Sequence, residues 1–442
     1  MISVRVEKHV IRKNNELYKY FDDLCFQSKN IYNAATYLIR QEFIETSKKV
    51  KAGELEQATI PKSGELYRLL KDSDARGDIP SASYSLELRS IQSTWKGFFK
   101  AAKDYKKHPE KYTGRPKMPG YLHKEKGRYP FAFYNNSPNA LKIKDGYLHT
   151  EATFLKRLNG IFKVHFKDYS KIAQIRIVPK PGYYNFEIVY EVEVPDLKEE
   201  SKRIAAIDLG VNNLMTIVTN FGTTPVVING RPLKSMNQYY NKELAKMHSE
   251  LMLYNGQYTS KRIENFTNKR NRKVDDYIQK ATKMVIDYCL ENDIDTLVCG
   301  YNPQWKTECD LGNGNTKVRH KNNQNFVQIP HLSIVNRLSY KCEQAGIRFI
   351  LIRESYTSGT SFLDYEEAIK ENYDKERRIY RGLFISNKGI EINGDVNGAY
   401  QILVKAFPEE LKERGHVKRH PVILDVPYIR KENIAKEYLL AA

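Results

Sequence analysis

The sequence has few cysteines, a deficit of acidic residues and no long hydrophobic run. No two of its five cysteines have the Cys-x-x-Cys spacing, which argues against a disulfide framework and a zinc knuckle. No stretch of 18 apolar residues occurs, and the first residues lack the apolar core of a signal peptide. We therefore expect a protein of a reducing compartment that has no membrane partner.

The deficit of acidic residues points to a class of partner. The 442 residues include 53 Asp and Glu against 72 Lys and Arg, and this net charge of +19 is typical of proteins that bind phosphate polyanions. Between Lys96 and Lys180 there are 20 basic and 6 acidic residues, so 14 of the 19 surplus charges lie in one fifth of the chain. Aromatic residues alternate with the basic ones there, as in nucleic-acid grooves. A solvated surface above core aromatics is the alternative interpretation.

The length is sufficient for two or three domains. In the first part, apolar periodicity predicts one strand, then three helices, then four more strands. The predicted strands are 2–11, 140–150, 161–166, 172–179 and 184–194, and the predicted helices are 34–43, 66–70 and 86–103. We expect the strands to close into a barrel, with the helices inserted between the first and second strands.

A polar segment, residues 195–202, separates this part from a second one. Apolar strands are predicted next, followed by long polar helices and then by alternating strands and helices. In chain order these are strands 204–209, 214–219 and 224–228, helices 232–254 and 260–291, strand 296–299, helix 332–345, strand 347–352 and helix 396–406. This is the element order of a ribonuclease-H-like α/β fold.

Three acidic residues of the second part are placed to meet at one edge of a sheet. Asp208 ends an apolar strand, Glu354 follows another, and Asp395 opens the last helix. The carboxyl ends of parallel strands share an edge, so the three side chains can converge. Grouped carboxylates repel unless cations lie between them, and a pair of Mg²⁺ ions about 4 Å apart supports phosphodiester cleavage. Two structural alternatives stay open: a turn hydrogen bond for Asp208 and a helix N-cap for Asp395.

Several segments of the chain carry a family resemblance. In the second part they are Asp208-Leu-Gly-Val-Asn-Asn-Leu, Leu338-Ser-Tyr-Lys, Ser355-Tyr-Thr-Ser and Asp395-Val-Asn-Gly-Ala-Tyr. In the first part they are Asn30-Ile-Tyr-Asn-Ala-Ala, Trp95-Lys-Gly-Phe-Phe and Gly114-Arg-Pro-Lys-Met-Pro-Gly-Tyr. In this order and spacing they resemble the TnpB family, also called OrfB, of transposon-encoded RNA-guided nucleases, which are relatives of type V CRISPR effectors. The resemblance covers nearly the whole chain.

The resemblance implies a multi-domain fold of the α+β and α/β classes. Its expected parts are a wedge β-barrel domain at 1–12 and 115–200, a helical recognition insert at 13–114, and a RuvC-like (ribonuclease-H-like) nuclease domain at 201–442. This sequence departs from the family in having no cysteine pairs where a zinc knuckle is usual. An insert at about 355–390 stands there instead, and we expect it to fold without zinc.

A second departure concerns the catalytic residues. The family usually has a catalytic Glu at the strand end where this sequence has Gly300, and a glycine side chain binds no metal. We expect Glu354, at the end of the neighbouring strand, to replace it. Asp364 and Glu308 are the other candidates, although both lie in polar stretches without an apolar strand to fix them.

The sequence thus predicts an RNA-guided DNA endonuclease that hydrolyses phosphodiester bonds at Asp208, Glu354 and Asp395. The same three residues are expected to hold the cofactor Mg²⁺, as two ions. Its expected partners are guide RNA and target DNA, in a prokaryotic cytoplasm and on the nucleoid when DNA is bound. Nucleic-acid contacts are expected from four basic residues: Lys106, Lys107, Arg115 and Lys117. Two alternatives stay open, a nuclease-inactive RNA-guided DNA-binding protein that acts as a repressor, and a basic RNA-binding protein without guided targeting.

Overall fold

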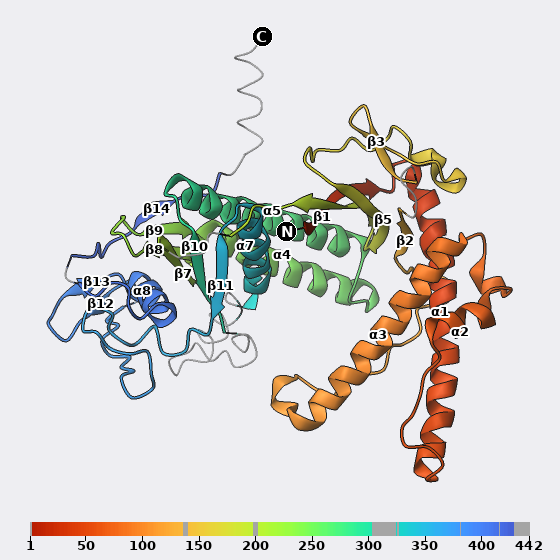
Figure 1. Cartoon of the computed structure of the whole chain (residues 1–442), viewed down its shortest axis with the longest axis horizontal. Coiled ribbons are helices and arrows are strands. Elements are labelled where there is room, and N and C mark those ends of the chain that lie inside the picture. The colour runs from red at the N-terminus through yellow and green to blue at the C-terminus, as the bar shows by residue number, and fades with distance from the viewer. Residues whose placement is uncertain are drawn as a thin grey trace. The chain divides into compact units, whose positions relative to one another are not determined.

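The computed structural model of the chain describes residues 2–135, 140–197, 202–302, 324, 327–380, 382–414 and 416–427. These fall into two compact units, Met1–Glu193 and Val194–Ala442, whose elements are labelled in Figure 1. Each unit has its own hydrophobic core. Both units mix helices and strands, which confirms the mixed α and β composition predicted from the sequence. Among the residues described, no helix is both long and apolar enough to cross a membrane.

The first unit contains a four-stranded antiparallel sheet in the order β1-β6-β5-β2. Its strands are β1 (Ile2–Arg12), β2 (Phe131–Tyr134), β5 (Lys171–Lys180) and β6 (Tyr183–Glu193). Strand β1 has the predicted alternation, yet its apolar Ile2 and Val4 are 65% and 58% exposed whereas Ser3 and Arg5 are buried. The alternation therefore predicted the strand correctly and gave no guide to which face is buried.

Two predicted strands of this unit were wrong. Residues 140–150 form a hairpin of β3 (Lys142–Lys144) and β4 (Tyr147–His149) instead of one strand. The chain reverses between them because Asp145 and Gly146 both adopt positive φ angles, 53° and 78°. Residues 161–166 make only an isolated bridge, from Lys163 to Tyr147 of β4.

Long helices fill the rest of the first unit. They are α1 (Leu17–Lys51), α2 (Ser63–Leu70) and α3 (Ser81–Lys107), with short 3₁₀ helices η1 (Asp74–Arg76), η2 (Pro109–Lys111) and η3 (Thr153–Leu158). Helix α3 buries Tyr84, Leu88, Ile91 and Trp95, whose spacing is helical. Helix α1 begins earlier than predicted, and its first turns, which carry Leu17 and Phe21, pack in the core.

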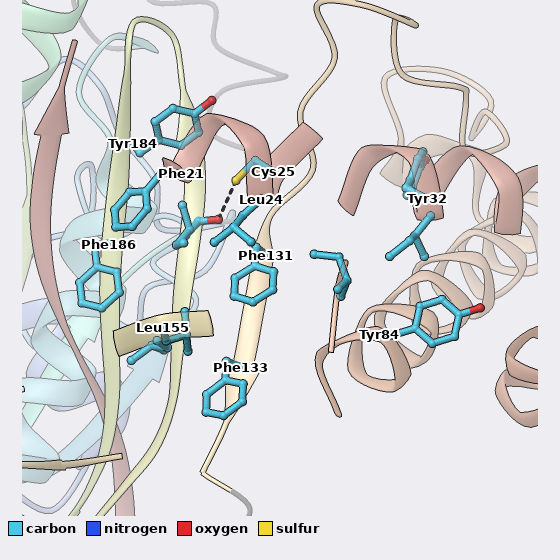
Figure 2. Close-up of a cluster of buried hydrophobic side chains, with 14 of the residues drawn as sticks. Phe21, Leu24, Cys25, Tyr32, Tyr84, Phe131, Phe133, Leu155, Tyr184 and Phe186 are labelled. Atoms are coloured by element: carbon cyan, nitrogen blue, oxygen red, sulfur yellow. Dashed lines mark hydrogen bonds between the residues drawn. The ribbon is translucent and has the colours of Figure 1, made fainter. Parts of the chain in front are cut away.

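Figure 2 shows how helix and sheet share this core. Phe21 of α1 stacks on Phe186 of β6 with ring centroids 5.7 Å apart. Cys25 is buried, and its Sγ donates to the carbonyl of Ile177 at 3.5 Å, the dashed line in Figure 2. The cysteine thus acts as a core residue, and burial raises its pKa, which disfavours thiolate chemistry.

The second unit is built on a six-stranded sheet in the order β11-β10-β7-β8-β9-β14. Its strands are β7 (Ile204–Leu209), β8 (Asn213–Thr219), β9 (Val226–Asn229), β10 (Thr296–Gly300), β11 (Arg348–Ile352) and β14 (Val422–Leu424). Strands β7, β8 and β9 are antiparallel, β10 runs parallel to both β7 and β11, and β14 runs parallel to β9. The sequence predicted all of these strands except β14, which is only three residues long.

Helices cover both faces of this sheet. They are α4 (Arg231–Asn255), α5 (Lys261–Glu291), α7 (His331–Gln344) and α8 (Gly394–Ala406), and a small hairpin of β12 (Phe384–Ile385) and β13 (Glu391–Ile392) precedes α8. Ala205 and Ile207 of β7 share a core with α5 and α7, whereas Ile204 and Ala206 share a core with α8. The alternation of β7 therefore assigns one face to α5 and α7 and the other to α8.

Candidate carboxylate site

Three strands of the second unit end side by side on the face that α8 covers. Their even-numbered residues pack in the core that contains α8: Ile204, Ala206, Val298, Ile350 and Ile352. Because side chains alternate between the faces of a strand, Asp208 and Gly300 lie on this face as well. The parallel pairing of β10 with β7 and β11 brings the carboxyl ends of all three strands to one edge. Glu354 follows β11 at the same edge.

Gly300 leaves room that the Glu354 side chain fills. A Cβ atom at position 300 would lie 2.6 Å from Glu354 Oε2 and 2.4 Å from Cδ1 of Ile402 on α8. Both distances are shorter than close-packed atoms tolerate, so no side chain fits at position 300 while these two neighbours keep their places. The Glu354 carboxylate therefore lies directly over the end of β10.

Asp395 lies in the first turn of α8 but is not its N-cap. Asn393 is the N-cap, and its Oδ1 accepts hydrogen bonds from the backbone N–H groups of Asp395 at 3.0 Å and Val396 at 3.2 Å. The N-cap interpretation of Asp395 is therefore wrong. One turn along the helix, a Cβ at Gly398 would lie 2.9 Å from Asp208 Oδ2, so this glycine lets α8 approach the Asp208 carboxylate.

Two residues hold the Asp395 carboxylate. Asn213 Nδ2 donates to Oδ2 at 2.7 Å, and Arg378 Nη2 donates to Oδ1 at 2.6 Å in a partly buried ion pair. Neither was predicted. Asn213 belongs to the segment that begins at Asp208, so its position was a usable signal, whereas Arg378 lies in a polar insert without periodicity.

The three carboxyl groups interact electrostatically through Asp208. Burial, and then repulsion from Asp395, raise the pKa of Asp208 well above its ordinary value, against the opposing effect of Arg378. Burial also raises the pKa of Glu354 well above its ordinary value, with repulsion from Asp208 adding to it and Lys405 opposing it. A cation among these groups would stabilise their ionised forms and relieve the repulsion.

The donor atoms at this edge fit a hard divalent cation. Glu354 Oε2 is buried and has no hydrogen-bond partner among the described residues, and carboxylate oxygens are ligands that Mg²⁺ prefers. With the side chains placed as they are, no group of three or more His, Cys, Asp and Glu residues in the described ranges is arranged around one ion. Asp208 is the carboxylate that interacts with both of the others.

The insert before α8 is organised around Arg377. Its Nη1 and Nη2 donate to the two carboxylate oxygens of Glu366 at 2.8 and 2.9 Å, and Nη2 also donates to the Asn372 carbonyl at 3.0 Å. Asp364 lies 4.0 Å from Arg377 and accepts a hydrogen bond from the backbone N–H of Asn387 at 2.7 Å. Asp364 therefore belongs to this network. The other candidate ligand, Glu308, lies outside the described residues.

The four predicted nucleic-acid contacts lie at the end of α3 and in the segment after it. All four are exposed, and none forms an ion pair with an acidic residue of the described part of the chain. Lys106 and Arg115 line one hollow of about 490 Å³, and Lys107 lines another of about 540 Å³. Lys117 lines neither. The structure thus groups two of the four around a single depression.

Two families match consecutive parts of the chain. Residues 187–306 match the OrfB_IS605 family, described as "Probable transposase", and residues 331–402 match the family described as "Cas12f1-like, TNB domain". The first match includes Asp208 and Gly300, and the second includes Glu354 and Asp395. Both sides of the carboxylate site therefore lie in matched regions.

Two individual proteins are similar to parts of this chain. The TnpB-like protein ORF457 of Acidianus two-tailed virus is 25% identical over 213 residues, which are 47% of this chain and 43% of that protein, so the match spans less than half of the relative. Cas12f1, in a cryo-EM complex with sgRNA and target DNA, has a similar fold, with a TM-score of 0.54 and 15% identity over 88% of this chain and 82% of that one. These matches support the resemblance of this chain to the TnpB family.

Proposed function

We propose that this protein is an RNA-guided DNA endonuclease that hydrolyses phosphodiester bonds at Asp208, Glu354 and Asp395 with Mg²⁺. The observation that carries the proposal is the Glu354 carboxylate in the space over Gly300. The family usually has a Glu at this strand end, and here a carboxylate reaches it from the neighbouring strand. This supports a rearranged catalytic site in place of a lost one.

The same proposal assigns the parts of the chain. Residues 1–12 and 115–200 form the wedge barrel, residues 13–114 the recognition insert, and residues 201–442 the RuvC-like domain. The last assignment is supported by a sheet in which three antiparallel strands are followed by two parallel ones. Cas12f1, which has a similar fold, is in complex with sgRNA and target DNA, and we propose guide RNA and target DNA as the partners here.

Each residue of the site has a distinct part in this chemistry. Asp208 would hold cations jointly with Asp395 and Glu354, and bound Mg²⁺ supplies activation of a water nucleophile and stabilisation of the leaving 3′-oxygen. Asn213 orients the Asp395 carboxylate through its 2.7 Å hydrogen bond. Burial of Asp208 and Glu354 limits the access of bulk water and strengthens their attraction to cations.

One observation favours a second candidate function. Arg378 forms a 2.6 Å ion pair with Asp395, which gives this carboxylate a cationic partner from the protein itself. If that pair persists when nucleic acid is bound, cation binding at Asp395 is weakened. The protein would then be a nuclease-inactive RNA-guided DNA-binding protein that acts as a repressor.

Purification with the native RNA tests both candidates. The RNA that copurifies is sequenced, a matching duplex DNA target is made, and cleavage is measured in Mg²⁺ and in excess EDTA. The endonuclease proposal expects cleavage that EDTA abolishes and that the Asp208→Asn variant lacks, with target binding retained. Target binding without cleavage by the wild type would favour the repressor.

A further inference from the structure

The first unit has a hollow with an aromatic floor. Phe43 of α1 and Phe98 and Phe99 of α3 line it, with ring centroids 5.0 Å apart for Phe43 and Phe99 and 5.1 Å apart for Phe98 and Phe99. The fully buried Trp95 contacts the rings of both Phe98 and Phe99 and so fixes them from the core side. The three phenylalanines are only partly buried, which leaves aromatic surface accessible inside the hollow.

The rim of this hollow is basic. Lys103, Lys106 and Arg115 line it and are exposed, and none of them forms an ion pair with a residue in the described ranges. Met118, which is 42% exposed, adds a further apolar contact on the side of the segment after α3. The volume of about 490 Å³ is in the range of about 300–1,000 Å³ that small-ligand sites occupy.

We propose that this hollow binds one unpaired base of the guide RNA, stacked against Phe98 and Phe99, with the flanking phosphates on Lys103, Lys106 and Arg115. This inference rests on the proposed function, which assigns RNA binding to the basic segment. Aromatic rings beside cations are the chemistry that recognises splayed-out nucleotides, because every base has a flat apolar face and a charged backbone beside it.

The charges of the rim favour this occupant over a second copy of the chain. A symmetric dimer through the hollow would bring two sets of Lys103, Lys106 and Arg115 together, and their repulsion would oppose association. Duplex DNA is disfavoured as well, since its bases are stacked inside the helix and cannot reach an aromatic floor. Single-stranded RNA supplies both the free base and the phosphates.

The test uses the full-length protein, freed of RNA by washing at high salt, and eight-nucleotide RNAs with 2-aminopurine at the centre. The comparison strand has the same length and charge but an abasic central position. We expect the base-containing RNA to bind about 5- to 140-fold more tightly than the abasic one, as stacking of one base predicts, with quenched 2-aminopurine fluorescence. Phe98→Leu should remove this preference, and Phe98→Tyr, which keeps the ring, should retain it.

Charge variants complete the design. Arg115→Gln should weaken both RNAs equally, and the matched control Lys48→Gln, an exposed lysine of α1 outside the hollow, should change neither. Equal binding of the two RNAs, or no effect of Phe98→Leu in a folded protein, would overturn the inference and leave RNA binding intact. A preference for the same DNA oligonucleotide, or a dimer that Phe98→Leu dissociates, would also overturn it. Binding of neither RNA would overturn the proposed function as well.

Discussion

The substitution Gly300→Ala gives a sharp test of the packing at the carboxylate site. The added methyl group would lie 2.4 Å from Cδ1 of the fully buried Ile402 and 2.6 Å from Glu354 Oε2. Neither neighbour can stay in place, and overpacking of this kind costs about 1–3 kcal/mol. We therefore expect the free energy of unfolding of the second unit to fall by that amount.

Displacement of Glu354 should also alter cation binding. Gly300→Ala is expected to weaken Mn²⁺ binding, measured by electron paramagnetic resonance with the RNA-free protein, because one carboxylate leaves the site. Adding Glu354→Ala removes one of the two clashes, so the double variant should recover part of the lost stability. Urea denaturation measures the stability of the single and the double variant, and hydrogen exchange of β10 shows that the second unit is the part affected.

The matched control is Gly64→Ala in α2, where an added Cβ has no atom within 4 Å. This change should leave the second unit unaffected and slightly stabilise α2. If Gly300→Ala unfolds at the same urea concentration as the wild type and binds Mn²⁺ equally well, the Glu354 carboxylate does not lie over Gly300, and the reasoning is refuted.

Four further predictions concern stability, zinc content and RNA binding. Burial raises the pKa of Glu87 to about 8. The stability that protonated Glu87 contributes to the first unit should therefore be full below the ordinary pKa of 4.5 and be lost as the pH rises through 8. Urea denaturation at several pH values measures this dependence, which Glu87→Gln should remove. Arg377→Leu should lower the free energy of unfolding of the second unit by about 3 kcal/mol, because Glu366 loses its ion-pair partner. Elemental analysis of the wild-type protein should find less than one zinc per chain. Replacing the four predicted RNA contacts with Ala should lower the salt-dependence slope of RNA binding by about 3, as four lost phosphate contacts predict. These residues are Lys106, Lys107, Arg115 and Lys117. An unchanged slope in a folded variant would show that the RNA binds elsewhere on the protein.

The sheet edge was predictable because strand signals are local. Apolar runs that end in Asp208 and just before Glu354 predict strands, and the carboxyl ends of parallel strands share an edge. The room over Gly300 was not predictable, since it depends on how α8 packs Ile402 against β10. The same holds for Arg378, because its contact with Asp395 depends on the Arg377 network that folds the insert.

In the first unit, local sequence patterns predicted which elements form but not how those elements pack. The alternation of β1 was correct, yet its apolar Ile2 and Val4 face outward because burial depends on what covers each face. The hairpin turn at Asp145-Gly146 was predictable, because Asp-Gly is a strong hairpin signal. The aromatic hollow requires Phe43 and Phe98 to meet from helices about 50 residues apart, which no local pattern reveals.

Cleavage by the Glu354→Gln variant tests the central claim most directly. Wild type, Glu354→Gln and the control Glu371→Gln are purified with the native RNA and given a matching DNA target in Mg²⁺. Glu371 is an exposed residue of the insert that follows Glu354. We predict cleavage by the wild type and by Glu371→Gln, and none by Glu354→Gln, which should still bind the target. Full cleavage by Glu354→Gln would contradict the assignment of Glu354 to the catalytic site.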